Sequence, residues 1–386
     1  SEIKNTLDHT RLTSTQLTHI PNLEKIPAST KRIKPLNNFL GQDRARASVE
    51  AGIALPYSGY NIFAVGTAGL GKRTMVKRLL QQHAKTMETP NDWVYVNNFQ
   101  NQRQPIALEL PSGQGPKFQA MLNQSWQTIL KQLERRFTAE TYHNRIEMIR
   151  QETGDEQQQA LIELTKEGAE LDLKLISRHD EHCFVPVHLI DDKLQEMSQE
   201  DLNVLSNKDR AELASNMRYM DKKLERLGLH LGDLEDDARD RVQILNRDIA
   251  KQVVLPRVEQ ILAKFKHVEG LEHYLKYYAE DIINNVEIVL EQEEDDFTPA
   301  LFSRVPARYQ ANVIITHKPN SGAPVIFEDF PTHYNLLGHV EQLTQNGTIT
   351  TDFTLIRPGT LHKANGGFLM LEAEQLLSLI HISEPT

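Results

Sequence analysis

Hydrophobic positions in the first quarter of the chain follow the order strand, turn, helix, strand. Residues 61–65 form a short apolar run, and a glycine-rich turn and a helical segment with Leu79 and Leu80 on one face come next. A second short apolar run lies at residues 93–96. Runs of this length are typical of strands buried in a parallel sheet. Because a βαβ crossover joins parallel strands, the pattern predicts an α/β unit over about residues 40–99.

The period of the hydrophobic positions becomes helical from about residue 116 to residue 290. One set of apolar residues there is spaced by alternating steps of four and three, which predicts the seam of a coiled-coil-like helix. Gly228 and Gly232 predict a bend or turn in that helix, and Pro256 predicts a break or kink. We expect a long antiparallel helical hairpin with a solvated outer face. The seam residues are Leu213, Met217, Met220, Leu224, Leu227, Leu231 and Leu234.

Strand patterns return after about residue 308, at residues 311–315, 324–327 and 368–371. This second α/β stretch completes the first only if the helices between them are an insertion in one domain. The sequence therefore predicts an α/β fold, a core with a parallel sheet that is interrupted by a long helical, coiled-coil-like insertion. The predicted divisions are an N-terminal arm (1–36), the first part of the core (37–115), the insertion (116–300), the second part of the core (301–376) and a tail (377–386).

Composition and charge narrow the class of protein. The chain has 386 residues, of which 53 are acidic and 43 basic, and a formal net charge of −10, which argues against a large nucleic-acid surface. The sequence has no run of the ~18 apolar residues that a membrane-spanning helix needs. The single cysteine, Cys183, fits a reducing compartment, and the first residues lack an apolar signal segment, so we expect a cytoplasmic protein.

A glycine-rich turn between the first predicted strand and helix carries the clearest chemical signal. Residues 66–72 match the pattern G-x-x-x-x-G-K, in which backbone N–H groups and a helix N-terminus bind phosphate oxygens. Lys72 would place its charge near the β- and γ-phosphates of a nucleotide. The alternative is a turn that only connects a strand to a helix. The candidate nucleotide-binding residues here are Gly66, Thr67, Ala68, Gly69, Leu70, Gly71, Lys72, Arg73 and Thr74.

The expected magnesium ligands are only partly present. Arg73 replaces the hydroxyl that normally follows the lysine, and Thr74 points about 100° further round the helix. The apolar run at residues 368–371 ends at Glu372, which can stand in for the usual aspartate as a magnesium ligand. Ala373 occupies the place of a catalytic glutamate. ATP, with a magnesium ion held by Glu372, is the predicted cofactor set.

Several segments together resemble the bacterial Lon-like proteases that carry an AAA+ module with a large helical insertion. Gly41 and Gln42 resemble part of the AAA+ segment near the adenine, which adds both to the candidate nucleotide-binding residues. The most specific similarity covers residues 350–369, and the whole resemblance spans about residues 35–376. Shorter similar segments are residues 59–63, 92–99, 110–113, 322–325 and 335–338.

The resemblance implies an ATP-dependent serine endopeptidase that assembles as a homo-hexameric ring and threads protein substrates into a proteolytic chamber. In this family the Ser–Lys catalytic pair lies in a domain C-terminal to the part present here, so the catalytic residues of proteolysis are not assigned in this chain. The resemblance identifies the chain as an N-terminal fragment, with neither membrane nor specific nucleic-acid partners expected. Some relatives have degenerate ATP sites, a possibility that Arg73 and Ala373 also indicate.

Two functions of other classes stay open from the sequence. One is a nucleotide-binding or substrate-binding module that does not hydrolyse ATP. The other is a coiled-coil chromosome-type ATPase, which requires helical arms several times longer and a basic DNA-facing surface, and neither is evident in this sequence.

Single aromatic and charged residues of the second α/β stretch give weaker signals. Tyr334 or Phe353 could grip a polypeptide, although a packed aromatic is the favoured interpretation of each. His362 and Lys363 are better explained as loop surface than as contacts to phosphate or a neighbouring subunit. The acid pair at residues 328–329 is assigned no catalytic role.

Two further segments need separate interpretation. His179 and His182 beside Cys183 imitate a metal cluster, but a solvated helix end explains them better. The last ten residues, 377–386, back-translate into a sequence that resembles a transposase adapter used in sequencing libraries. This predicts that the tail is not native and that the gene continues beyond about Leu376.

Overall fold

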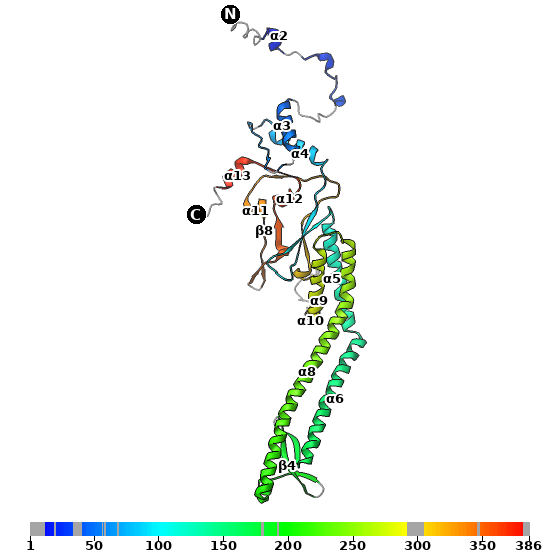
Figure 1. Ribbon diagram of the computed structural model, residues 1–386. Helices are drawn as coiled ribbons and strands as arrows, with labels where there is room; N and C mark the ends of the chain where they lie inside the picture. Colours follow the sequence, from blue (N-terminus) through cyan, green and yellow to red (C-terminus); the bar gives the residue numbers. More distant parts are fainter. Residues whose placement is uncertain are drawn as a thin grey trace. The chain divides into compact units, whose positions relative to one another are not determined.

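The computed structural model describes residues 12–18, 21–33, 41–55, 57, 59–67, 69–178, 181–190, 193–291, 305–345 and 348–380. The chain divides into two units, residues 1–83 and residues 84–386. The fold is a mixture of helix and sheet, and helices make up most of the second unit's length (Figure 1).

The first unit contains two longer helices, α3 (Asp43–Ile53) and α4 (Lys72–Ala84). Leu79 and Leu80 of α4 are buried, which confirms the predicted apolar face of this helix. The side chain of Ile62 lies against Gly52 of α3, where an added Cβ would be 3.1 Å from it. The shorter helical segments of this unit are α2 (Ser14–Leu17), η1 (Leu23–Lys25) and η2 (Thr30–Arg32).

The segment before the glycine-rich turn is not a strand, contrary to the prediction. Residues 60–67 have irregular backbone, and the side chains of Phe63 and Val65 are 77% and 83% exposed. A parallel strand is stable only when neighbouring strands take up its backbone hydrogen bonds. Since the described residues of the first unit form no strand, this segment has no such neighbour within its own unit.

Most strands of the second unit pair in antiparallel fashion. The prediction that residues 93–96 form a parallel strand is wrong. In the central sheet β1 (Asp92–Val96) lies between β2 (Ile106–Leu110) and β6 (Ala311–Ile315), and both pairs are antiparallel. The short connection between β1 and β2 explains the first pair, because a hairpin needs no crossover. β7 (Val325–Glu328) and β12 (Phe368–Leu371) do form a parallel pair.

Four helices and the central sheet enclose the main hydrophobic core of the second unit. The helices are α5 (Gly115–Phe137), the C-terminal part of α8 (Asn207–Lys264), α9 (Leu271–Asn284) and α10 (Val286–Glu291). We call this part the base. One face of α5 is fully buried there, as its helical spacing predicts, and Trp126 stacks on Tyr309 with ring centroids 4.4 Å apart.

An arm of two long helices extends from the base. Figure 1 shows α6 (Glu140–Glu170) and α8 side by side, with β4 (Glu181–Ile190) at the far end. The seven predicted seam residues of α8 are all buried or half-buried, which confirms that they share the covered face. The arm therefore has the predicted hairpin form.

A small sheet at the far end of the arm was not predicted. β4 pairs with β3 (Leu173–Arg178) over its first part and with β5 (Lys193–Glu196) over its last part, both antiparallel. A short helix, α7 (Gln199–Val204), then leads into α8. The sheet packs on the helices through Phe184, and with the helix residues around it we call it the tip.

The helix α8 continues through Gly228, Gly232 and Pro256, so a turn at the two glycines and a break at Pro256 are wrong, whereas a bend or a kink stays a prediction. A glycine costs a helix interior only about 1 kcal/mol relative to alanine. Proline removes one hydrogen bond, but the buried residues Val254 and Val258 on either side of Pro256 hold the helix against the base.

The remaining elements of the second unit are short. β8 (Gly338–Val340) pairs with β11 (Ile356–Pro358), and β9 (Leu343–Gln345) pairs with β10 (Thr348–Thr350), both in antiparallel fashion. The last six residues of the predicted tail, 381–386, lie outside the described residues. The elements are η3 (Ala307–Tyr309), α11 (His333–Leu337), β8 (Gly338–Val340), β9 (Leu343–Gln345), β10 (Thr348–Thr350), η4 (Phe353–Leu355), β11 (Ile356–Pro358), α12 (Thr360–Lys363) and α13 (Ala373–Ile380).

A chain of polar side chains joins the arm to the base. The hydroxyl of Tyr142 on α6 donates to Oδ1 of Asn246 on α8 at 3.0 Å, and Nδ2 of Asn246 donates to Oε1 of Glu287 on α10 at 2.8 Å. Asn246 is buried, and burial together with the Glu287 carboxylate raises the pKa of Tyr142, which therefore stays a neutral donor.

We expect Asn246→Ala to lower the free energy of unfolding of the second unit by about 2 kcal/mol, because it leaves a donor and an acceptor without partners. Urea denaturation followed by tryptophan fluorescence measures this, since both tryptophans, Trp93 and Trp126, lie in the second unit. Gln243→Ala, at an exposed position of the same helix, is the control. Equal losses for the two variants would contradict the assignment.

Candidate nucleotide-binding site

The glycine-rich turn has an open backbone and leads directly into a helix, as phosphate binding requires. Gly69 and Gly71 have φ angles of 86° and 73°, a conformation that glycine adopts at no steric cost. An added Cβ at either position would meet no atom within 4 Å, so the backbone of the turn is accessible. The turn ends at Lys72, the first residue of α4. Ala68 lies outside the described residues.

The Lys72 side chain folds back over the turn. Its Nζ donates to the carbonyl oxygen of Gly66 at 2.7 Å, and both residues are exposed. The ammonium group therefore lies beside the first residue of the loop, where a phosphate bound to the loop would contact it. Thr67, Leu70, Arg73 and Thr74, also predicted for the site, are exposed as well.

The charge of α4 favours an anion at its N-terminal end. The helix carries Lys72, Arg73, Lys77 and Arg78 and has no acidic residue. Positive side chains near a helix N-terminus are unfavourable with respect to the helix dipole, and a bound phosphate reverses this by supplying negative charge. The loop, the N-terminal end of the helix and these cations together can bind a polyphosphate.

The other two candidate nucleotide-binding residues, Gly41 and Gln42, immediately precede α3. Gly41 and Gln42 have φ angles of 78° and 57°, and Gln42 is the N-cap of α3 but makes no side-chain capping bond. The Gln42 side chain thus plays no part in stabilising the helix end. Both residues belong to the same unit as the glycine-rich turn.

Glu372, the predicted magnesium ligand, lies in the second unit between β12 and α13. It is half-buried, and its carbonyl oxygen accepts the N–H groups of Gln375 and Leu376, both at 3.1 Å. Ala373 is the first residue of α13. Lys72 belongs to the first unit and Glu372 to the second, so the common site that the sequence predicts remains a prediction.

The parallel pairing of β7 with β12 places a second acid, Asp329, at the sheet edge where Glu372 lies. Leu371 of β12 pairs with Glu328 of β7, so Glu372 and Asp329 follow parallel neighbours at the same sheet edge. Sequence reasoning missed this juxtaposition, although both apolar runs end in an acid. Among the described residues, no group of three or more His, Cys, Asp or Glu side chains could hold a metal ion. Magnesium in nucleotide sites commonly uses one or two carboxylates plus phosphate oxygens, so the two acids still fit it.

The weaker candidate residues differ in how far they are exposed and in the element that holds them. Phe353 is buried, as its favoured interpretation predicts, whereas Tyr334 is 67% exposed and so is not a packed aromatic. Cys183 and His182 lie in a strand, β4, so the expected helix end at this point is wrong. His179 lies outside the described residues.

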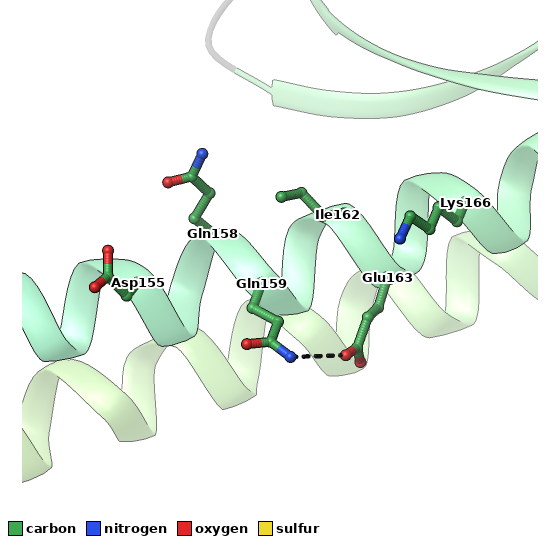
Figure 2. Close-up of a pocket in the computed structure, with 6 residues that line it drawn as sticks. All are labelled: Asp155, Gln158, Gln159, Ile162, Glu163 and Lys166. Atoms are coloured by element: carbon green, nitrogen blue, oxygen red, sulfur yellow. Dashed lines mark hydrogen bonds between the residues drawn. The ribbon is translucent and has the colours of Figure 1, made fainter.

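Two surface hollows do not coincide with the predicted site. One, of about 400 Å³, lies on the exposed, largely polar face of α6 in the arm. Figure 2 shows the side chains that line it. Nε2 of Gln159 there donates to Oε1 of Glu163 at 3.3 Å. The other, of about 190 Å³, is lined by residues of α3 and by Leu79, Gln82 and His83 of α4, at the end of the helix remote from Lys72. Neither hollow is lined by a residue of the glycine-rich turn.

No helix in the described part of the chain is long and apolar enough to cross a membrane.

Comparison with known families defines the class of protein. A family model described as the LonB-like AAA domain matches residues 321–384, which include β7, β12 and Glu372. A second family model, the Lon-like LonC helical domain, matches residues 92–125, from β1 into α5. No curated protein matches the chain. The chain thus carries an AAA-type domain, a class that implies nucleotide binding. The two matches, each over a short part of the chain, together support a member of the Lon-like protease family.

Proposed function

We propose that the chain is the ATP-binding AAA+ part of a Lon-like ATP-dependent serine protease, which recognises and unfolds protein substrates in the cytoplasm for degradation by a separate Ser–Lys domain. The observation that carries this proposal is the geometry of the glycine-rich turn, taken together with the two family matches. Two glycines with positive φ, an open backbone and Lys72 at the start of a basic helix suit the β- and γ-phosphates of ATP.

In this proposal Glu372, which directly follows β12, supplies the acidic group of the nucleotide site. Glu372 would hold magnesium, which neutralises charge on the phosphates, and Asp329 would stand beside it. The arm would be the coiled-coil-like insertion of such a domain.

Exposed aromatic residues of the second unit suit a protein substrate. Phe330 and Tyr334 are each 67% exposed and lie at the start of α11, and Leu337, the last residue of this helix, is half-exposed. Aromatic side chains contribute large apolar contact area to an extended polypeptide without requiring a particular sequence. We place the grip on substrate here, in a homo-hexameric assembly whose arms contact substrates or neighbouring subunits.

A second candidate function is nucleotide binding without hydrolysis. Arg73 cannot supply the oxygen that its position normally gives to magnesium, and Ala373 cannot orient a water molecule. These two residues favour a module in which ATP is only a structural ligand.

Reversion of both residues distinguishes the two functions. We expect the double variant Arg73→Thr and Ala373→Glu, in the full-length protein, to raise the rate of ATP hydrolysis at least 10-fold with little change in ATP affinity. Steady-state phosphate release and equilibrium titration measure the two quantities. Lys77→Thr, at an exposed position of the same helix, is the control. Binding without turnover in both the wild type and the double variant would support the non-hydrolysing module instead.

A further inference from the structure

The arm contains two hydrophobic cores with a poorly packed length of helix between them. The core of the base includes Val254 and Ile261 of α8, and the core of the tip includes Leu164, Phe184 and Met220. Along α8, each residue between Met220 and Asn246 is half-buried or exposed, and along α6 the first buried residue is Leu164. A single continuous helix thus passes from one core to the other.

Cross-helix ion pairs mark the two ends of this uncored length. Near the tip Nζ of Lys223 donates to the carboxylate of Glu167, which also accepts the Tyr219 hydroxyl at 3.0 Å. Nearer the base Arg241 pairs with Glu152. We call the residues between these pairs, 153–163 of α6 and 224–240 of α8, the stalk, of which Leu224 and Leu227 still pack against the core of the tip.

The packing within the stalk is weak on the α6 side. Of the four half-buried α6 residues there, Thr153, Gln157 and Ala160 are polar or small, and the fourth is Leu161. Polar or small side chains bury little apolar area, so each turn of the stalk gains less stabilisation than a turn in either core. Segments with few buried apolar contacts are those that open or bend at the lowest free energy.

Three glycines in the stalk have no packing role. Gly154, Gly228 and Gly232 lie inside helices, and an added Cβ at each would meet nothing within 4 Å. Gly168 in the tip is different, because an added Cβ would lie 2.4 Å from the Phe184 ring. Packing explains Gly168, whereas the stalk glycines only lower the local stability of the helices.

We propose that the arm bends within the stalk, so that the tip moves as one body relative to the base. The two cores stay intact because each has its own buried side chains and an ion pair at its border. The bend is a property of the arm alone and does not depend on nucleotide binding at Lys72. The tip can therefore reach a substrate or a neighbouring chain in more than one position.

Spin-label distances along α8 test this proposal. In a Cys183→Ser background, labels at Ser215→Cys and Arg247→Cys lie on either side of the stalk, ~48 Å apart along a straight helix. Labels at Arg247→Cys and Lys264→Cys lie within the base. They give the width of the distance distribution that is expected for an unbent helix. We expect the first distance distribution to be at least twice as wide as the second.

Replacement of the three stalk glycines by alanine should narrow the wide distribution toward that of the base pair. Thr165→Ala, at an exposed position of α6 beyond the stalk, should leave it unchanged. Amide hydrogen exchange gives a label-free check, with faster exchange in the stalk than in either core. A first distribution as narrow as the base pair, or a wide one unaffected by the three alanines, would overturn the proposal.

Discussion

Replacement of Lys72 by alanine is expected to weaken ATP binding to the full-length protein by about 10- to 100-fold. A hydrogen bond from a charged group contributes about 1.5–3 kcal/mol, and each 1.4 kcal/mol is a factor of ten in affinity. Isothermal titration with a non-hydrolysable ATP analogue measures the change.

Lys77→Ala is the matched control for Lys72→Ala, because Lys77 is an exposed cation on the same helix but lies beyond its first turn. Removal of a general positive charge affects both variants, whereas a phosphate contact affects only Lys72. Thermal unfolding of both variants shows whether loss of the bond to the Gly66 carbonyl has disturbed the loop. If Lys72→Ala binds the analogue as tightly as the control does, the glycine-rich turn is not the phosphate site.

Elements that depend on local periodicity could be predicted from the sequence. The apolar faces of α4 and α5 repeat at helical spacing, and the short apolar runs of β6, β7 and β12 are strands in the structure. The glycine-rich turn could also be predicted, because the residues that form it are consecutive in the sequence. In each case the residues that determine the structure are neighbours in the sequence.

Strand partners and helix continuity could not be predicted, because they depend on residues far away in the sequence. The sequence of β1 predicts a buried parallel strand, yet its neighbours β2 and β6 both run antiparallel to it. The run at residues 61–65 has strand composition, but the residues of its own unit that the structure describes form no strand beside it. Pro256 predicts a break, but packing of its neighbours in the base keeps α8 continuous.

The same limit applies to the acids of the candidate site. Glu372 could be selected because it directly follows an apolar run. Asp329 could not, because its position next to Glu372 depends on the pairing of β7 with β12. To predict a magnesium site built from two strands, one needs the register of the strand pair as well as the residue types.

One buried carboxylate joins three segments of the second unit. The Asp92 side chain is fully buried, and its Oδ2 accepts the Gly115 N–H at 2.8 Å and the Thr316 hydroxyl at 3.1 Å. Its Oδ1 accepts the His317 N–H at 2.9 Å. Asp92 thereby connects the start of β1 with the N-terminus of α5 and the residues after β6. A negative charge at this helix N-terminus is favourable with respect to the helix dipole.

We expect Asp92→Ala to lower the free energy of unfolding of the second unit by about 3–5 kcal/mol, since two N–H groups and a hydroxyl lose their acceptor. Asp92→Asn keeps one acceptor oxygen and should cost less, so it remains measurable if the alanine variant fails to fold. Urea denaturation followed by tryptophan fluorescence gives both values. Glu109→Ala removes an exposed carboxylate that accepts only an exposed bond from Asn91, and should change stability by less than about 1 kcal/mol. Because β1 and β2 lie next to each other, equal losses for Asp92→Asn and Glu109→Ala would show that the buried carboxylate does not connect the three segments.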